Sequence, residues 1–346
     1  MDIFGRIRGK ETTSSGEPAG LRNLITGLLT KSYLLVFLIL TIAVGTLVSP
    51  VFLTGRNLEN IIVTGAVVSV LAVGQFMVIV TRGIDLSVGS VAALATVLIA
   101  ILLENGQPAL LAIALTLAAC GFVGLINGLV VVYAGITPFI ATLAMLSIAR
   151  GVAFIIQVGT LIAISNQGFM DAFAGNVLGI PSPVIIFLVV MLVAAFVMQF
   201  TTFGRQLYAI GGNPEAARLS GLPVNRNLTA AYVTSGVLAG VAGLMLAAQL
   251  SQGSSLIGQG YELNSIAAAV VGGTSLFGGT GNPISAVIGG LIIGTISNIM
   301  NLVGIQSEPQ LVILGVVILV AVFFTSGSGP RRLVRAVRRL VRSSER

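Results

Sequence analysis

The chain has 346 residues, of which 55 % are hydrophobic and only 8 % are charged, and its mean hydropathy is +1.05. A soluble domain carries about 25 % charged residues, so this sequence lacks the charge to cover a surface in water. The net charge of +7 therefore indicates Lys and Arg in cytoplasmic membrane segments, and not a nucleic-acid surface. With no His and a single Cys inside an apolar segment, the composition offers neither a metal centre nor an intrachain disulfide.

Apolar runs recur from residue 33 to residue 325. Runs of about 20 residues are the length that crosses the hydrocarbon core of a bilayer as a helix. We therefore expect an all-α polytopic integral membrane protein with about ten transmembrane helices. The predicted spans are 33–53, 58–81, 86–103, 109–133, 137–157, 183–200, 228–250, 264–279, 283–303 and 309–325.

The two ends of the chain are basic. Residues 1–32 lack the apolar core and cleavage site of a removed signal peptide, so the first span is expected to act as the insertion signal. Residues 326–346 carry seven arginines in the pattern of an amphipathic helix that lies on anionic lipid or contacts a partner protein. With both ends in the cytoplasm, sixteen of the 18 basic residues fall on the inner side, as the positive-inside rule requires.

Two connections between the spans are long. Residues 158–182 form the longest outer loop and contain enough apolar residues for a short interfacial helix. Residues 201–227 form the longest inner loop. Because the other connections are short, residues 33–325 are expected to form one membrane domain without a soluble module.

The inner loop contains the stretch GGNPEAARLSG at residues 211–221. Asn213 is a suitable N-cap, Pro214 fits the first helical position, and Glu215 lies where the helix dipole favours an anion. A terminating glycine at Gly221 completes a predicted two-turn helix over 214–220. Since an isolated helix this short is unstable in water, it must dock either on its own spans or on a partner protein.

Four stretches carry a resemblance to a known family: RGIDLSVGS (82–90), GITPFIATLAMLSIARG (135–151), FGRQLYAIGGNPEAARLSGL (203–222) and GYELNSIAAAVVGGTSLFGG (260–279). In this order they resemble the ribose-type (monosaccharide) permease subunits of bacterial ABC importers, within the branched-chain amino acid and sugar permease family. The resemblance implies the ABC importer permease fold in a bacterial inner membrane, with both termini cytoplasmic. It also implies three kinds of partner: a second permease subunit, usually an identical copy, two cytoplasmic ATPase subunits and an extracytoplasmic sugar-binding protein.

The resemblance also implies that residues 213–221 match the coupling helix that sits in a cleft of the ATPase. The candidate coupling residues are Arg205, Asn213, Pro214, Glu215, Ala216, Ala217, Arg218, Leu219, Ser220 and Gly221. No G-x-x-x-x-G-K-[ST] motif occurs in the chain, so ATP and Mg are expected on a separate ATPase chain. This chain is accordingly expected to bind no cofactor and to be a transport subunit, not an enzyme.

Polar residues in or near the spans are candidates for a gate or translocation path, because unpaired polar groups are costly in lipid. These candidates are Arg82, Asp85, Ser87, Asn127, Thr137, Thr142, Asn264 and Thr274. Their alternative role is to bond only to neighbouring helices. Arg150 is expected either to reach the outer interface or to dock the binding protein.

The stretch RGIDLSVGS leaves two interpretations open. In the structural one, Arg82 extends to the cytoplasmic surface while Asp85 or Ser87 caps the next helix. In the other, Arg82 and Asp85 form a gate that closes as a pair in one state and parts in another.

Other transport functions remain as alternatives. A permease of the same architecture for a branched-chain amino acid or a nucleoside would share the long inner loop. An ion-coupled secondary transporter is disfavoured, because the carboxylates map to loops or span ends and Asp85 is the nearest exception.

Overall fold

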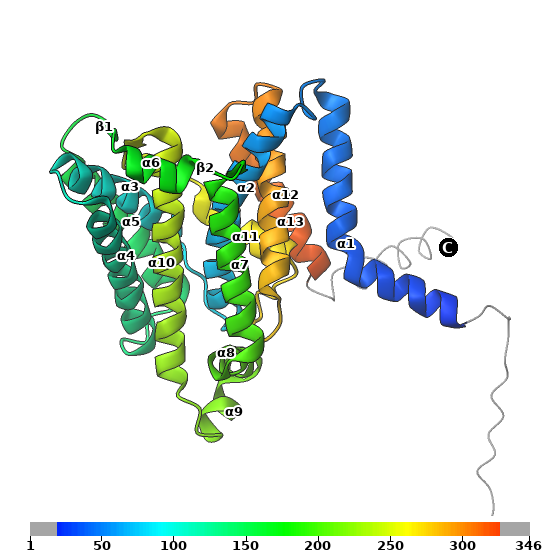
Figure 1. Ribbon diagram of the computed structural model, residues 1–346. Coiled ribbons are helices and arrows are strands. Elements are labelled where there is room, and N and C mark those ends of the chain that lie inside the picture. The colour runs from blue at the N-terminus through cyan, green and yellow to red at the C-terminus, as the bar shows by residue number, and fades with distance from the viewer. Residues whose placement is uncertain (1–18, 326–346) are drawn as a thin grey trace, which may run out of the picture.

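The computed structural model describes residues 19–325 (Figure 1). The predicted tail helix over 326–346 and most of the predicted N-terminal segment, residues 1–18, lie outside the described residues. The described chain is a helical bundle with four two-residue strands. This confirms the prediction of an all-α polytopic membrane protein.

Each of the ten predicted spans overlaps a helix. These helices are α1 (Ala19–Val48), α2 (Gly55–Val80), α3 (Val88–Glu104), α4 (Ala109–Val132), α5 (Pro138–Gln157), α7 (Ser182–Phe200), α10 (Val224–Leu250), α11 (Tyr261–Val271), α12 (Pro283–Leu302) and α13 (Ser307–Thr325). By length and composition, six helices of the described chain are able to cross a membrane: α2, α4, α5, α7, α10 and α12. Three shorter apolar helices accompany them, Leu34–Val48, Val88–Glu104 and Pro309–Val320.

The predicted span over 264–279 is wrong in its extent. The helix α11 has 11 residues and ends at Val271, so it rises about 16 Å, roughly half of the bilayer core. Beyond it, Gly273, Gly278 and Gly279 have φ values of 85°, 79° and 74°, which continue no right-handed helix. The residues after Val271 in this predicted span therefore form a non-helical segment.

The helix contacts repeat between two parts of the chain. α2 packs along α12 as α10 packs along α4, and α2 contacts α11 as α10 contacts α3. Likewise, α3 contacts α4 and α5 as α11 contacts α12 and α13. Helices α2–α5 thus correspond in order to α10–α13. The end of α2 and the start of α10 both lie beside one inner helix, α8 (Thr202–Gly212), so the two parts run through the membrane in opposite directions.

Each part contains an interrupted span. The non-helical residues 81–87 separate α2 from the short helix α3, and residues 251–260 separate α10 from the short helix α11. The first interruption is mostly buried and follows residues 65–80 of α2, which are all buried, whereas in the second only Gly253, Ser254, Ser255 and Gly258 are buried. Backbone that leaves a helix inside a membrane protein must be satisfied by other protein groups, so these segments are natural places for polar side chains.

The long loops contain the short elements. The outer loop holds α6 (Gln167–Ala174), which agrees with the predicted short helix, and its N-cap is the side chain of Asn166. Strand β1 (Ile162–Ala163) pairs with β4 (Gln252–Gly253), and β2 (Asn176–Val177) pairs with β3 (Ile180–Pro181). The inner loop folds into α8 and α9 (Pro214–Leu219), which lie together at one end of the bundle (Figure 1).

Candidate coupling helix and inner polar cluster

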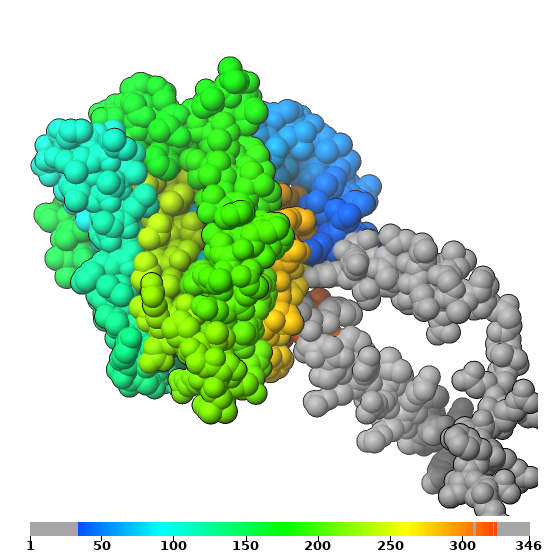
Figure 2. Space-filling model, turned by 60° about the horizontal axis from the view of Figure 1, so that its bottom comes forward, coloured from blue at the N-terminus to red at the C-terminus, as the bar shows by residue number. Residues whose placement is uncertain are grey.

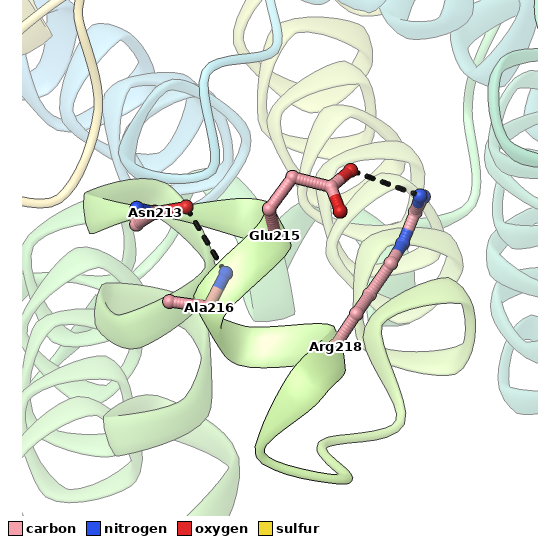
Figure 3. A network of polar contacts seen from close by, with 4 residues as sticks. All are labelled: Asn213, Glu215, Ala216 and Arg218. Atoms are coloured by element: carbon pink, nitrogen blue, oxygen red, sulfur yellow. Dashed lines mark hydrogen bonds and ion pairs between the residues drawn. The ribbon is translucent and has the colours of Figure 1, made fainter.

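The helix α9 forms as its sequence predicts. The Asn213 Oδ1 atom accepts a hydrogen bond from the Ala216 backbone N–H at 3.1 Å (Figure 3). Pro214 occupies the first turn, and the Glu215 carboxylate lies 3.6 Å from the Arg218 guanidinium. Gly221 follows with a φ of 75°, the left-handed conformation that ends a helix. The predicted helix over 214–220 is confirmed to within one residue.

Only a small part of α9 is anchored to the rest of the chain. Ala217 is buried and packs with Ile210 of α8 and Val224 of α10. Leu219, at the other side, is 88 % exposed. The side chains of Glu215 and Arg218 are also mostly exposed, so α9 presents one apolar residue and an ion pair away from the bundle. With this end of the bundle turned forward, the green to yellow-green residues of α7 to α9 lie exposed (Figure 2).

The helix α8, which positions α9, was not expected as a separate element. It begins where the Thr201 hydroxyl accepts a hydrogen bond from the Gly204 backbone N–H at 3.3 Å. Leu207 and Ile210 are buried, and with the partly buried Phe203 they follow the i, i+4, i+7 spacing of one helix face. That spacing, after a Thr N-cap, was the available sequence signal. Arg205 lies on the exposed side of α8.

A second group of polar residues surrounds Asp85 in the interruption between α2 and α3. The Oδ1 atom accepts from the Ser87 N–H at 2.9 Å and from the Ser87 hydroxyl at 2.6 Å, while Oδ2 accepts from the Ser235 hydroxyl at 2.8 Å. The Asn127 side chain donates to the Ser87 hydroxyl at 2.9 Å. The Gln75 amide, oriented to satisfy both groups, pairs with the backbone N–H and carbonyl of Asp85.

We call these residues the Asp85 cluster: Gln75, Asp85, Ser87, Asn127 and Ser235. They come from α2, α4, α10 and the interruption before α3, so their hydrogen bonds join four parts of the bundle, while the carboxylate itself bonds only Ser87 and Ser235. Thr142 of α5 adds a contact, because its hydroxyl donates to the Ile84 carbonyl at 3.2 Å. Ser235 is a member that the sequence did not single out.

The proposed Arg82–Asp85 pair is not formed in the described chain. The Arg82 Nε atom donates to the Gly211 carbonyl at 2.7 Å, and an Nη atom donates to the Gly212 carbonyl at 2.6 Å. Asp85 is already satisfied by hydroxyl and amide donors. The capping interpretation is not met to the letter either: the N-cap of α3 is Ser87, which makes no side-chain capping hydrogen bond, and the Asp85 carboxylate instead closes a local turn with the Ser87 N–H just before the helix.

Besides Arg82 and Thr142, three gate candidates lie outside the Asp85 cluster. Thr137 is the exposed N-cap of α5, and Asn264 is partly buried in α11. Thr274 is buried in the turn after α11, where its hydroxyl has no hydrogen-bond partner among the described residues. The sequence grouped these residues by polarity alone, whereas the fold separates them.

The comparisons with known proteins identify the family. Residues 57–322, well over half of the chain, match the family described as branched-chain amino acid transport system / permease component. The chain belongs to this permease family. The described helices and this match together establish a multi-pass membrane protein.

Several curated relatives of this permease are sugar permeases. It is 41 % identical to the ribose import permease protein RbsC of Escherichia coli over 295 residues, which is 83 % of this chain and 91 % of the relative. It is 41 % identical to the D-allose permease AlsC of Escherichia coli over 83 % of this chain and 89 % of the relative. The L-arabinose permease AraH of Azospirillum brasilense is 36 % identical over 89 % and 91 %. No solved structure matches the chain.

In this permease, Arg150 holds the second interrupted span. Its guanidinium, on α5, donates to the carbonyl oxygens of Ser255 and Ile257, the latter at 3.1 Å. Gln157 of the same helix accepts from the Ser255 N–H at 2.8 Å. The non-helical segment 251–260 is therefore fixed to α5, which neither of the two expected roles of Arg150 anticipates.

The inner helix α8 of the permease is also fixed by Tyr208. Its hydroxyl donates to the Gly281 carbonyl at 2.9 Å, and burial raises the pKa of Tyr208 above its usual value. The hydroxyl thus stays protonated and able to donate throughout the physiological pH range.

The described residues contain no cluster of three or more His, Cys, Asp or Glu side chains that is arranged to hold a metal ion. Cys120 is buried in α4 against α3, where burial in apolar surroundings makes a thiol inert.

Proposed function

We propose that this chain is the membrane-spanning subunit of an ATP-driven ABC importer that moves a ribose-like monosaccharide into the cell. The observation that carries the proposal is the identity of 41 % with a ribose import permease across 91 % of that relative. Relatives named for allose and arabinose favour the same substrate class. The description of the matching family names branched-chain amino acids, so an amino acid or a nucleoside is the alternative solute.

In this proposal α9 couples the permease to the ATPase. Ala217 is its buried residue, and its free side carries Leu219 and the Glu215–Arg218 pair. An apolar side chain that is 88 % exposed on a short helix favours a protein partner over packing on its own spans. Arg205 and residues 213–221 are the proposed contact residues, while ATP and Mg are held by the ATPase.

The proposed importer contains further subunits. Two copies of this permease line the pathway, two ATPase domains bind on the side of α9, and a sugar-binding protein docks on the outer loops. The basic residues Arg205, Arg218 and Arg226 all lie near α8, α9 and the start of α10, which supports a cytoplasmic position for this end. Both termini are proposed to be cytoplasmic and the membrane to be the bacterial inner membrane.

The function is tested by uptake into proteoliposomes that contain the permease and its ATPase, with the binding protein outside and ATP inside. The panel is ribose, allose, arabinose, leucine and a nucleoside. We expect ATP-dependent uptake of at least one of the three sugars and none when the ATPase is omitted. Uptake of leucine or the nucleoside alone contradicts the substrate class, and uptake that persists without the ATPase supports an ion-coupled transporter instead.

Replacing Leu219 with Asp is expected to weaken binding of the ATPase at least about tenfold, because a buried Leu contributes roughly 1.5–3 kcal/mol and a charge there opposes burial. The dissociation constant is measured with purified permease in nanodiscs. Leu178→Asp is the matched control, since Leu178 is 99 % exposed on the outer loop. Equal affinity of the Leu219→Asp and Leu178→Asp variants would remove α9 from the interface.

A further inference from the structure

The inner end of α2 meets two other segments in one contact, which we call the inner junction: residues 80–82, 211–212 and 278–279. The Gly279 N–H donates to the Val80 carbonyl at 2.8 Å. The Arg82 side chain donates to the carbonyls of Gly211 and Gly212, the last two residues of α8. At the inner junction, α2, α8 and the turn after α11 are therefore held together by hydrogen bonds whose acceptors are all backbone carbonyls.

Glycine makes this contact close. A methyl group added at Gly211 would collide with the Val80 carbonyl oxygen and lie 2.5 Å from the Gly279 nitrogen. A methyl group at Gly279 would lie 2.9 Å from the Gly212 Cα atom. Since the backbones touch, movement of α8 cannot be absorbed by a soft layer of side chains.

Arg82 is suited to its place by chemistry. The last carbonyls of a helix lack intrahelical partners and carry the negative end of the helix dipole. The planar guanidinium donates to two neighbouring carbonyls at once, which an ammonium group does less well. Arg82 has a φ of 69°, an uncommon conformation for a residue with a side chain, and such strain persists only where surrounding contacts hold it.

The position of Arg82 in the chain connects two parts of the molecule. Gly212, whose carbonyl it binds, directly precedes Asn213, the N-cap of α9. Arg82 itself lies three residues before Asp85, which holds the start of α3 through Ser87. One side chain therefore lies between the candidate coupling helix and the first interrupted span.

We propose that Arg82 is a positioning residue that transmits movement of α9 to the interruption between α2 and α3. This inference rests on the proposed function, because the ATPase supplies the movement. When α9 shifts, the Gly211 and Gly212 carbonyls shift with it, and the guanidinium moves residues 81–87. Since these residues are not helical, they change conformation without breaking the hydrogen bonds of α2 or α3.

The test is the ratio of sugar imported to ATP hydrolysed by the complete reconstituted importer. For Arg82→Ala, which removes both charge-assisted hydrogen bonds to α8, we expect this ratio to fall at least about tenfold while ATP hydrolysis changes by less than about twofold. Arg56→Ala is the matched control, because Arg56 is an exposed arginine at the other end of α2. The control is expected to keep the wild-type ratio.

Two further variants keep the inference testable if Arg82→Ala does not fold. Arg82→Lys retains the charge without the fork and is expected to give an intermediate ratio. Gly211→Ala forces α8 away from Val80 and is expected to lower the ratio although Arg82 is present.

A wild-type ratio in Arg82→Ala overturns the inference, as does a parallel loss of import and hydrolysis in every folded variant. Absence of ATP-dependent import by the wild-type importer overturns the proposed function itself, and the role of Arg82 with it.

Discussion

Replacing Asp85 with Ala is expected to destabilise the folded permease by at least about 3 kcal/mol, because each of three buried donors left without an acceptor costs roughly 1–3 kcal/mol. Those donors are the Ser87 N–H, the Ser87 hydroxyl and the Ser235 hydroxyl. The loss is measured as a lower melting temperature of the purified permease in one detergent.

Asp85→Asn separates the hydrogen bonds of Asp85 from its charge. The amide keeps one acceptor oxygen for Ser87, and the Ser235 hydroxyl can rotate to accept from the new NH₂ group. We expect a stability loss of less than about 1.5 kcal/mol, the net value of one hydrogen bond, and normal transport. Glu59→Ala, which removes an exposed carboxylate from α2, is the control for a general effect of charge. A folded Asp85→Asn permease that does not transport contradicts a purely structural role of Asp85 and supports a charge-dependent gate.

The order of the spans could be predicted because lipid demands long apolar runs that hydropathy detects directly. The same measure fails at residues 272–279, where Gly and Phe count as apolar but the backbone turns at Gly273 and Gly278. A hydropathy value carries no information about backbone dihedral angles, so the predicted helix was longer than α11 is. The interrupted span is visible only when the positive φ values are known.

The helix α9 could be predicted because its determinants are local. The side chain of Asn213 caps a backbone N–H three residues away, and Pro214 and Gly221 act through their own φ angles. The docking partner of α9 could not be predicted, because these local capping signals are the same whatever protein surface the helix contacts.

The contacts of Arg82 could not be predicted in the same way. The nearest opposite charge along the chain is Asp85, and this proximity suggested an ion pair. The actual partners are backbone carbonyls 129 and 130 residues away. Because every residue has a backbone carbonyl, the sequence does not mark which one an arginine will bind. Ser235 was missed for a related reason. Hydroxyl groups in helices often bond to the carbonyl four residues back, as Thr234 does. The sequence therefore does not distinguish a hydroxyl such as that of Ser235, which bonds to a distant side chain.

The contact between α4 and α10 is expected to be as sensitive as the Asp85 cluster. A methyl group at Gly124 would collide with the Tyr232 carbonyl oxygen and lie 3.0 Å from the Val233 Cα atom. From the other helix, a methyl group at Gly236 would lie 2.5 Å from the Cys120 carbonyl oxygen. The two backbones therefore pack directly on each other, as small residues allow in membrane helices.

Gly124→Ala is expected to destabilise the permease by about 2–3 kcal/mol, the cost of overpacking, although Ala is intrinsically the better helix former by about 1 kcal/mol. Gly151→Ala in α5 is the matched control, because nothing lies within 4 Å of its added methyl group. The control shares the gain in helix propensity, so the difference between the two melting temperatures isolates the contact. Equal melting temperatures would show that α4 and α10 separate at little cost.

Transport is expected to respond more strongly than stability to Gly124→Ala. The collision at Tyr232 lies one helical turn before Ser235, and Gly124 lies one turn before Asn127. Forcing the helices apart there moves Ser235 and Asn127, whose hydrogen bonds hold Asp85 and Ser87. Uptake is therefore measured well below the melting temperature of the variant. We expect a folded Gly124→Ala permease to lose uptake while Gly151→Ala keeps normal uptake. Normal uptake by both variants would show that the contact between α4 and α10 does not affect the Asp85 cluster.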